Sequence, residues 1–166
     1  MQDNLAMINR IIEAHNTIRG NIKLVGDSVT DLEALFSLQK TDAGWSLSSL
    51  ETLAENKGKL LQTLSALDEG LRNHFRLEEH ALPPILGEIL MLALALDHKE
   101  IGKLLGDAKT VVADAKLDGL SQEKLLKKKS EIQRSVTDIL QKVEEHARKE
   151  EIVLKMAQKA LESKKA

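Results

Sequence analysis

The sequence predicts an all-α protein: an up-down-up-down antiparallel four-helix bundle that forms a single domain over residues 1–166. Three observations support this fold. Leucine, alanine, lysine and glutamate dominate the composition, and all four residue types favour helices. Three breaks, at 39–46, 82–88 and 116–122, divide the chain into four long segments. Within each segment, apolar residues alternate at spacings of three and four, as in helices that pack in a bundle.

We expect four helices, over 3–38, 47–81, 87–115 and 121–163. Ser48 with Glu51 resembles a capping box, and Ser121 is a plausible N-cap of the last helix. Pro83 and Pro84 should end the second helix, because proline lacks the backbone donor and clashes with the preceding turn. The apolar stripe of the last helix is expected to contain Ile132, Val136, Ile139, Val143, His146, Glu150, Val153, Ala157 and Ala160.

The first segment and the loop after it contain three residues that invite a structural interpretation. Gly20 and Gly26 either only loosen the helix, at up to ~1 kcal/mol each relative to alanine, or kink it so that His15 approaches the bundle centre. Trp45, alone in the first loop, is expected to cover the far end of the core.

Composition excludes several classes of function. The absence of cysteine excludes disulfides, zinc-thiolate sites and iron–sulfur clusters. A formal charge of −2 with interspersed acids and bases predicts no nucleic-acid binding, and the lysines of 124–134 are expected to form a solvated helix face. The apolar run 89–96 is far shorter than the ~20 residues that span a bilayer, and no signal peptide is evident. We therefore expect a cytoplasmic protein without a membrane segment.

The apolar stripes contain polar exceptions on all four helices. Apart from Lys57, they are His15, His74, Glu78, His98, His146 and Glu150. Because a helix rises ~1.5 Å per residue, counting from the breaks places all six in one layer near the Pro83 end of the bundle. By the same pattern Glu79, His80 and Glu151 lie off the stripes, and Glu79 and His80 are expected to face outward.

Two buried glutamates need either partners or a cation, since burying a carboxylate without compensation costs several kcal/mol. A purely structural network of His–Glu pairs is one interpretation. The repetition of the pattern favours another: "HFRLE" and "HARKE" both place a glutamate four residues after a histidine, on the same helix face. Four imidazoles and two carboxylates can serve two cations, and this mixture of ligands suits iron better than magnesium or calcium.

With these residues identified, the sequence resembles the hemerythrin-like, or HHE cation-binding, family. The family pattern has a histidine on helix one, H-x-x-x-E on helix two, a histidine on helix three and H-x-x-x-E/D on helix four. The matching residues are His15, then His74 and Glu78, then His98, then His146 and Glu150. The stretches "EEHALPPIL" and "LDHKEI" also resemble family motifs, and the resemblance covers essentially the whole chain.

The resemblance implies two iron ions, one held by His15 and His74 and the other by His98 and His146. Both glutamates of the set would bridge the ions, together with an oxo or hydroxo ligand. Proteins of this family bind oxygen reversibly, sense oxygen, iron or redox state, or handle nitric oxide and iron.

The sequence departs from the oxygen-carrying members of the family at two positions. Those members have a second histidine one turn before the third-helix ligand, where this chain has Leu94. Their last carboxylate is an aspartate five residues after its histidine, whereas in this chain Glu150 follows His146 by four residues. With one imidazole fewer, an iron has an open position or takes water or a nearby glutamate such as Glu79 or Glu151. This favours sensing or reaction over oxygen storage.

The leading hypothesis is a non-haem di-iron protein that binds or reacts with O2, or with nitric oxide or peroxide, in sensing, redox or iron handling. No general acid or base is evident beyond the ligands, so we expect a ligand-binding or sensing metalloprotein rather than a dedicated enzyme. The alternatives are a di-iron oxidase or peroxidase, an iron-centre repair protein, or a metal-stabilised helical interaction module. The run 89–96 is either buried under the N-terminal segment and the 82–88 corner, or serves as a homodimer face or an apolar route for gas.

Overall fold

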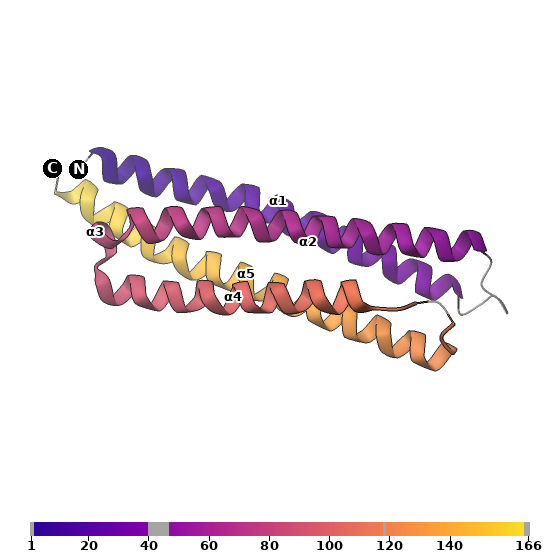
Figure 1. Ribbon diagram of the computed structural model, residues 1–166. Coiled ribbons are helices and arrows are strands. Elements are labelled where there is room, and N and C mark those ends of the chain that lie inside the picture. Colours follow the sequence, from indigo (N-terminus) through magenta and orange to yellow (C-terminus); the bar gives the residue numbers. More distant parts are fainter. Residues whose placement is uncertain (1, 40–46, 118, 165–166) are drawn as a thin grey trace.

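The structure is a computed structural model that describes residues 2–39, 47–117 and 119–164. These residues form helices and no strand, which confirms the all-helical prediction. The helices are α1 (Gln2–Gln39), α2 (Leu47–Ala81), α3 (Pro83–Leu86), α4 (Glu88–Asp114) and α5 (Gln122–Ser163). The four long helices lie side by side in an elongated bundle, and the short α3 lies at the same end as the start of α1 and the end of α5 (Figure 1).

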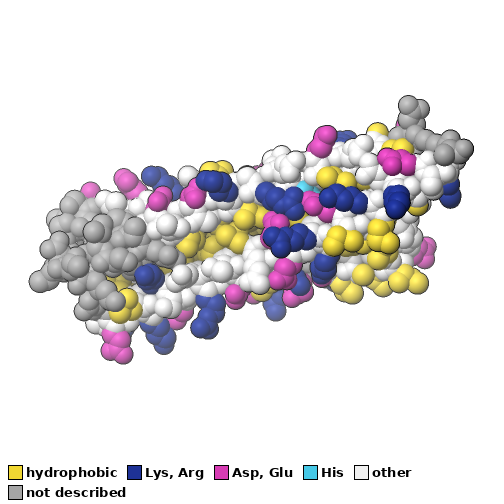
Figure 2. All heavy atoms as spheres, turned by 180° about the vertical axis from the view of Figure 1, so that it is seen from behind, with side chains coloured by type: hydrophobic (Ala, Val, Ile, Leu, Met, Phe, Trp, Pro, Cys, Tyr) yellow, Lys and Arg dark blue, Asp and Glu magenta, His cyan; other side chains and the backbone are white. Residues whose placement is uncertain are grey.

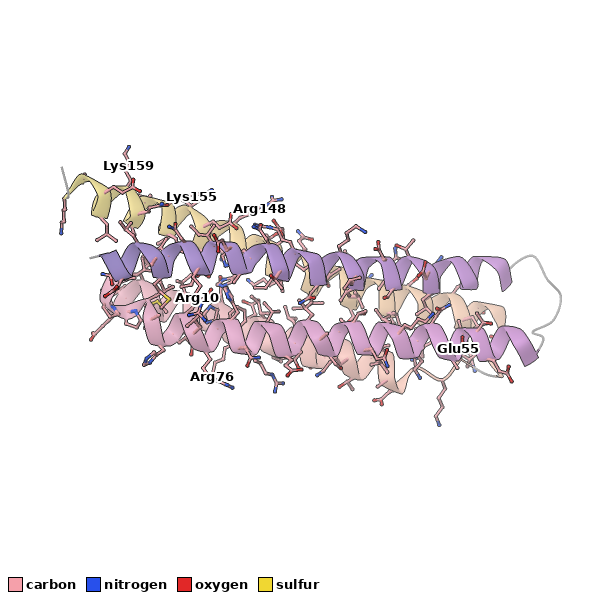
Figure 3. All side chains as sticks on the ribbon, turned by 90° about the horizontal axis from the view of Figure 1, so that it is seen from above. Arg10, Glu55, Arg76, Arg148, Lys155 and Lys159 are labelled. Carbon is pink, nitrogen blue, oxygen red and sulfur yellow. The ribbon has the colours of Figure 1, made fainter. Side chains whose placement is uncertain are left out.

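Each long helix packs against two others. Helix α1 contacts α2 and α5, and α4 also contacts α2 and α5, so the four contacts form a closed ring around the core. Charged side chains such as Arg76 of α2 and Lys155 and Lys159 of α5 point away from the bundle, while other side chains fill the space between the helices (Figure 3). No helix in the described ranges is long and apolar enough to cross a membrane.

The helix ends follow the expected local signals. Helix α2 stops at Ala81, and the two prolines then begin the single turn of α3. Gly87 joins α3 to α4 with φ 83°, a left-handed conformation that favours glycine. Ser121 caps α5, because its side-chain oxygen accepts a hydrogen bond from the backbone N–H of Lys124 at 3.4 Å. The capping role expected of Ser48 and the covering role expected of Trp45 fall outside the described side chains.

Helix α1 runs through Gly20 and Gly26 as one continuous helix. Because a Cβ added at Gly20 would meet no atom within 4 Å, Gly20→Ala is expected to raise the free energy of unfolding by about 0.5–1 kcal/mol, as measured by urea denaturation. Gly87→Ala is the matched control, and its positive φ should make it destabilising. A loss of stability in Gly20→Ala would show that the helix needs glycine there.

The apolar core is divided in two. The larger cluster takes its buried residues from 18–32, 53–75, 101–117 and 125–143. The smaller cluster consists of Ile8, Ile11, Leu82, Met91, Leu94 and Leu154. On α1, α4 and α5 the predicted polar residues come between the two clusters in sequence. On α2, His74 and Glu78 flank Phe75, the last residue of the larger cluster on that helix. The predicted polar residues therefore form a polar layer across the bundle near its α3 end.

Lys57, the other polar exception, has a separate structural role. It is half-buried, and its Nζ donates a hydrogen bond at 2.8 Å to the carbonyl of Ala115, directly after the last turn of α4. Carbonyl groups at the end of a helix lack helical partners and attract cations. Lys57, on the neighbouring helix α2, therefore provides a hydrogen-bond donor for a carbonyl group at the C-terminal end of α4.

Candidate metal centre

The six polar residues expected on the stripes are all buried and lie together. None is more than 7% exposed, and the side chains of Glu78 and Glu150 are fully buried. All four long helices contribute to this polar layer, so it forms only when the whole bundle is assembled.

The potential ligand atoms of the polar layer fall into two groups, within each of which the atoms lie no more than 4.8 Å apart. One group consists of Glu78, His98, His146 and Glu150, and the other of His15, His74 and Glu78. Glu78 belongs to both groups. The rings are paired in the same way, with centroids 5.0 Å apart for His15 and His74 and 4.9 Å apart for His98 and His146.

The inward-facing nitrogens approach the carboxylates closely. His98 Nε2 lies 3.2 Å from Glu78 Oε2, His15 Nε2 lies 3.7 Å from Glu78 Oε1, and His74 Nε2 also contacts Glu78 Oε1. On the other side of the layer, His146 Nε2 lies 3.2 Å from Glu150 Oε2.

These close approaches do not satisfy the hydrogen-bonding needs of the layer. In the described part of the chain, the buried side-chain atoms without a hydrogen-bond partner are Nε2 of His74, His98 and His146 and both carboxylate oxygens of Glu78 and Glu150. Leaving buried polar atoms without partners is costly. In this layer nitrogen and oxygen atoms point toward one another without forming hydrogen bonds. This is the arrangement expected of ligand atoms around a cation.

The outward-facing nitrogens of three histidines are held by carboxylates, here called the outer carboxylates: Glu79, Asp97 and Glu151. His15 Nδ1 donates to Glu151 at 3.0 Å, His98 Nδ1 to Glu79 at 2.8 Å and His146 Nδ1 to Asp97 at 3.2 Å. A carboxylate on Nδ1 fixes the tautomer and the ring orientation, which leaves Nε2 free to bind a metal and makes it a stronger ligand.

Basic side chains in turn hold two of the outer carboxylates. Arg19 donates to Glu151 at 2.7 Å, and Lys149 donates to Asp97 at 2.6 Å. Each outer carboxylate also links two helices, because it lies beside a stripe residue on its own helix and reaches a histidine on the next one. Asp97, for example, precedes His98 on α4 and holds His146 on α5.

Phe75 shields one side of the layer. Its ring stacks on His98 with centroids 3.9 Å apart and planes within 7°, and it meets the ring of His146 edge-on at 5.6 Å. Phe75 was not predicted as part of the site, although it directly follows His74. An aromatic ring stacked on the imidazole limits its rotation and excludes water from its face.

Burial and neighbouring charges shift the pKa values of four residues of the layer. Burial by itself would lower the pKa values of His15 and His98, but Glu78 and the other nearby carboxylates outweigh burial and raise both pKa values above the usual 6.5. Burial would likewise raise the pKa of Glu78, but three histidines lower it well below its usual range. In contrast, burial, reinforced by the neighbouring Glu78, raises the pKa of Glu150.

The structure also places the three residues that the sequence analysis put off the stripes. His80 is exposed, and Glu79 has a side chain that is 47% exposed. Glu79 and Glu151 are candidate additional metal ligands by sequence, but in the structure each faces the outer nitrogen of a histidine and neither belongs to the two ligand groups. Sequence reasoning missed Asp97 as an outer carboxylate. The sequence does contain a signal for this role, because Asp97 is an acidic residue directly next to a stripe histidine.

The donor set fits a pair of first-row transition-metal ions. Four imidazoles and two carboxylates are too rich in nitrogen for calcium or magnesium, and they suit iron, zinc or copper. The atoms without partners, the shared carboxylate and the histidines fixed through Nδ1 all agree with two adjacent cation positions.

Comparison with protein families gives a match that covers nearly the whole chain. The family described as the hemerythrin HHE cation binding domain matches residues 6–157, a range that includes the entire polar layer. Searches of curated proteins and of solved structures gave no significant match. The buried histidines and glutamates that can hold a metal are thus found in a chain that belongs to the hemerythrin HHE cation-binding family.

Proposed function

We propose that this protein is a non-haem di-iron protein that binds or reacts with O2, or with nitric oxide or peroxide, and that it acts in sensing, redox chemistry or iron handling. The observation that carries the proposal is the convergence of buried nitrogen and oxygen atoms that have no hydrogen-bond partner. The family match supports metal binding, and the mixture of imidazole and carboxylate ligands favours iron.

The proposed scaffold is a single-domain, up-down-up-down antiparallel four-helix bundle. The closed ring of helix contacts supports it, as does the position of α3 at the end where α1 begins and α5 ends (Figure 1). On this scaffold, His15 and His74 would hold one iron, while His98 and His146 would hold the other.

Glu78 is the better supported of the two proposed bridging ligands. Its two oxygens face opposite groups, since Oε1 contacts His15 and His74 whereas Oε2 contacts His98. Glu150 belongs only to the group that contains His98 and His146. The ion held by His15 and His74 would therefore have fewer protein ligands, and we propose this side of the layer as the place where a small ligand binds.

When bound, two iron ions held by these histidines and glutamates would supply electrons and open coordination positions for a small ligand. The chain's own contribution is a fixed environment that is apolar on one side. The outer carboxylates hold three histidines in place, and the smaller apolar cluster, which includes Ile11 and Leu94, closes the layer toward the α3 end. Leu94 occupies the position where oxygen-carrying relatives have a further histidine, so it contributes apolar surface rather than a ligand.

The proposal is tested by measuring metal content per chain together with the visible spectrum, first without oxygen and then after exposure to air. Two irons per chain with absorption bands typical of a bridged diferric pair are expected. The persistence or decay of the bands in air separates a carrier from a reactive site. If the chain takes up no metal during iron reconstitution, the proposal is overturned, and the polar layer is then a structural network of His–Glu pairs.

The outer carboxylates provide an independent prediction. Asp97→Asn keeps the shape of the side chain but removes the charge that faces His146 Nδ1, and it should weaken metal binding about 10–100-fold. A titration against a competing chelator measures this. Glu100→Gln on the same helix is the matched control, because Glu100 is exposed, pairs with Lys142 and holds no histidine. Equal affinities in the two variants would mean that the outer carboxylates do not support the metal.

A further inference from the structure

One side of α4 exposes a stripe of large apolar side chains. Ile89, Leu92 and Leu96 are 88%, 64% and 60% exposed, and their spacings of three and four residues place them on one side of the helix. Figure 2 shows hydrophobic side chains gathered at the lower edge of the bundle, in the half that contains α3 and the start of α4 in Figure 1. Single exposed leucines are common in monomers, but a continuous apolar stripe indicates a binding surface.

Charged residues extend this stripe at both ends. Glu88 lies at its N-terminal end, and the spacing of three and four continues with Lys99 and Lys103 at its C-terminal end. All three are exposed, and none makes a hydrogen bond or an ion pair with another residue in the described part of the chain. The stripe is therefore acidic at one end, apolar in the middle and basic at the other end.

Such a stripe is complementary to itself in the antiparallel direction. With a two-fold axis near residue 94, Leu92 would face the partner's Leu96, and Ile89 would face the aliphatic part of the partner's Lys99. Along the helix axis, Glu88 lies about 9 Å from this midpoint and Lys99 lies about 7.5 Å from it on the other side. In an antiparallel dimer, Glu88 of each copy would therefore lie close to the lysines at the basic end of the other copy. A parallel arrangement would instead bring like charges together.

The stripe also borders the metal centre. A pocket of about 500 Å³ between α2 and α4 is lined by Leu92, Leu96 and Lys99, and it reaches Phe75 and His98. A second copy seated on the stripe would cover the mouth of this pocket and exclude water from the His98 side of the polar layer.

We propose that two copies of this chain form an isologous dimer through antiparallel packing of their α4 stripes, and that the dimer covers the pocket beside His98. Paired self-complementary surfaces of this kind are the usual basis of two-fold dimers. The proposal rests on exposure and charge alone, and it holds for the metal-free chain as well as for a metal-loaded one.

The molar mass in solution tests the proposal, measured by light scattering across a dilution series with and without metal. The expected mass is twice the 18.4 kDa of one chain. Leu96→Glu should weaken the dimer more than about 100-fold because it buries an unpaired charge. Leu24→Glu, at a leucine of similar exposure (56%) on α1, should leave the dimer intact. Circular dichroism verifies that both variants are folded.

Charge exchange tests the antiparallel register. Glu88→Lys should weaken the dimer about tenfold, since two symmetric contacts are lost. Combining it with Lys99→Glu and Lys103→Glu should restore the original affinity. The proposal is overturned if the unmodified chain is monomeric throughout, if Leu24→Glu dissociates as Leu96→Glu does, or if the combined variant remains as weak as Glu88→Lys.

Discussion

Glu78→Ala is expected to abolish dinuclear metal loading, with less than one iron bound per chain. Glu78 is the one residue common to both ligand groups, and its two oxygens face different histidine pairs. Its removal would therefore take a ligand from both proposed ions at once. The loss of affinity should exceed the ~10–100-fold that loss of an outer partner costs. Metal analysis after iron reconstitution gives the result.

Two further variants make the Glu78 result specific. Glu69→Ala replaces an exposed glutamate on the same helix and should retain two irons. Glu150→Ala should retain about one, because Glu150 belongs to only one of the two groups. If Glu78→Ala still binds two irons, then Glu78 does not bridge them.

Removal of metal is expected to destabilise the protein strongly. A bound ion stabilises the folded chain by about 4 kcal/mol when its free concentration is 1,000 times its dissociation constant. For a chain of this size each such ion should raise Tm by roughly 10 °C. Thermal unfolding of the chelator-treated and the reconstituted protein measures the difference. Equal Tm values would show that the layer does not bind metal in the folded state.

The effect of metal on stability should also depend on pH. Without metal, the raised pKa values of His15 and His98 mean that the folded chain binds more protons than the unfolded chain does, so stability is lost as pH rises above about 6.5. The lowered pKa of Glu78 has the opposite consequence, and its contribution is lost as pH falls below about 4.5. The metal-free chain should therefore be most stable in mildly acidic solution.

Metal ions compete with these protons, because a histidine must lose its proton at Nε2 before that nitrogen can bind a metal. The difference in Tm between loaded and metal-free protein should consequently widen from pH 6 to pH 8. Thermal unfolding at several pH values tests the sign. A difference that narrows with rising pH would contradict the charge arrangement described for the polar layer.

The sequence predicted the helices and the polar layer well because both depend on local patterns. The bounds of the long helices agree with the expected ones to within one residue, since glycines, prolines and caps act within a turn. The one departure is that the second break contains the short helix α3. The six stripe residues were identified because a polar residue in an apolar repeat is visible in the sequence itself.

The prediction of the stripe on the last helix was less accurate beyond Glu150. Val153 was expected to be buried, but it is only half-buried and Leu154 is fully buried instead, while the expected Ala160 is exposed. An α-helix has 3.6 residues per turn, so a strict alternation of three and four drifts around its surface along so long a helix.

The surroundings of the polar layer could not be derived from the sequence. Asp97 and Phe75 lie beside stripe positions, and whether such a flanking residue reaches the neighbouring helix depends on how the two helices are rotated and spaced. The same applies to Asp68, which is buried although it is not on the stripe. It is neutralised by Arg72 at 3.0 Å and Lys109 at 2.7 Å, and Lys109 comes from another helix.

The position of the polar layer between two apolar clusters has a consequence for assembly. Aliphatic layers alone would tolerate the sliding of one helix along another, because leucine and isoleucine can replace each other in neighbouring layers. A slip of one turn, about 5.4 Å, would place His98 or Glu150 among the aliphatic residues of a cluster and separate them from their partners. The polar layer thus selects one axial register among many of similar apolar packing, and it does so before any metal binds.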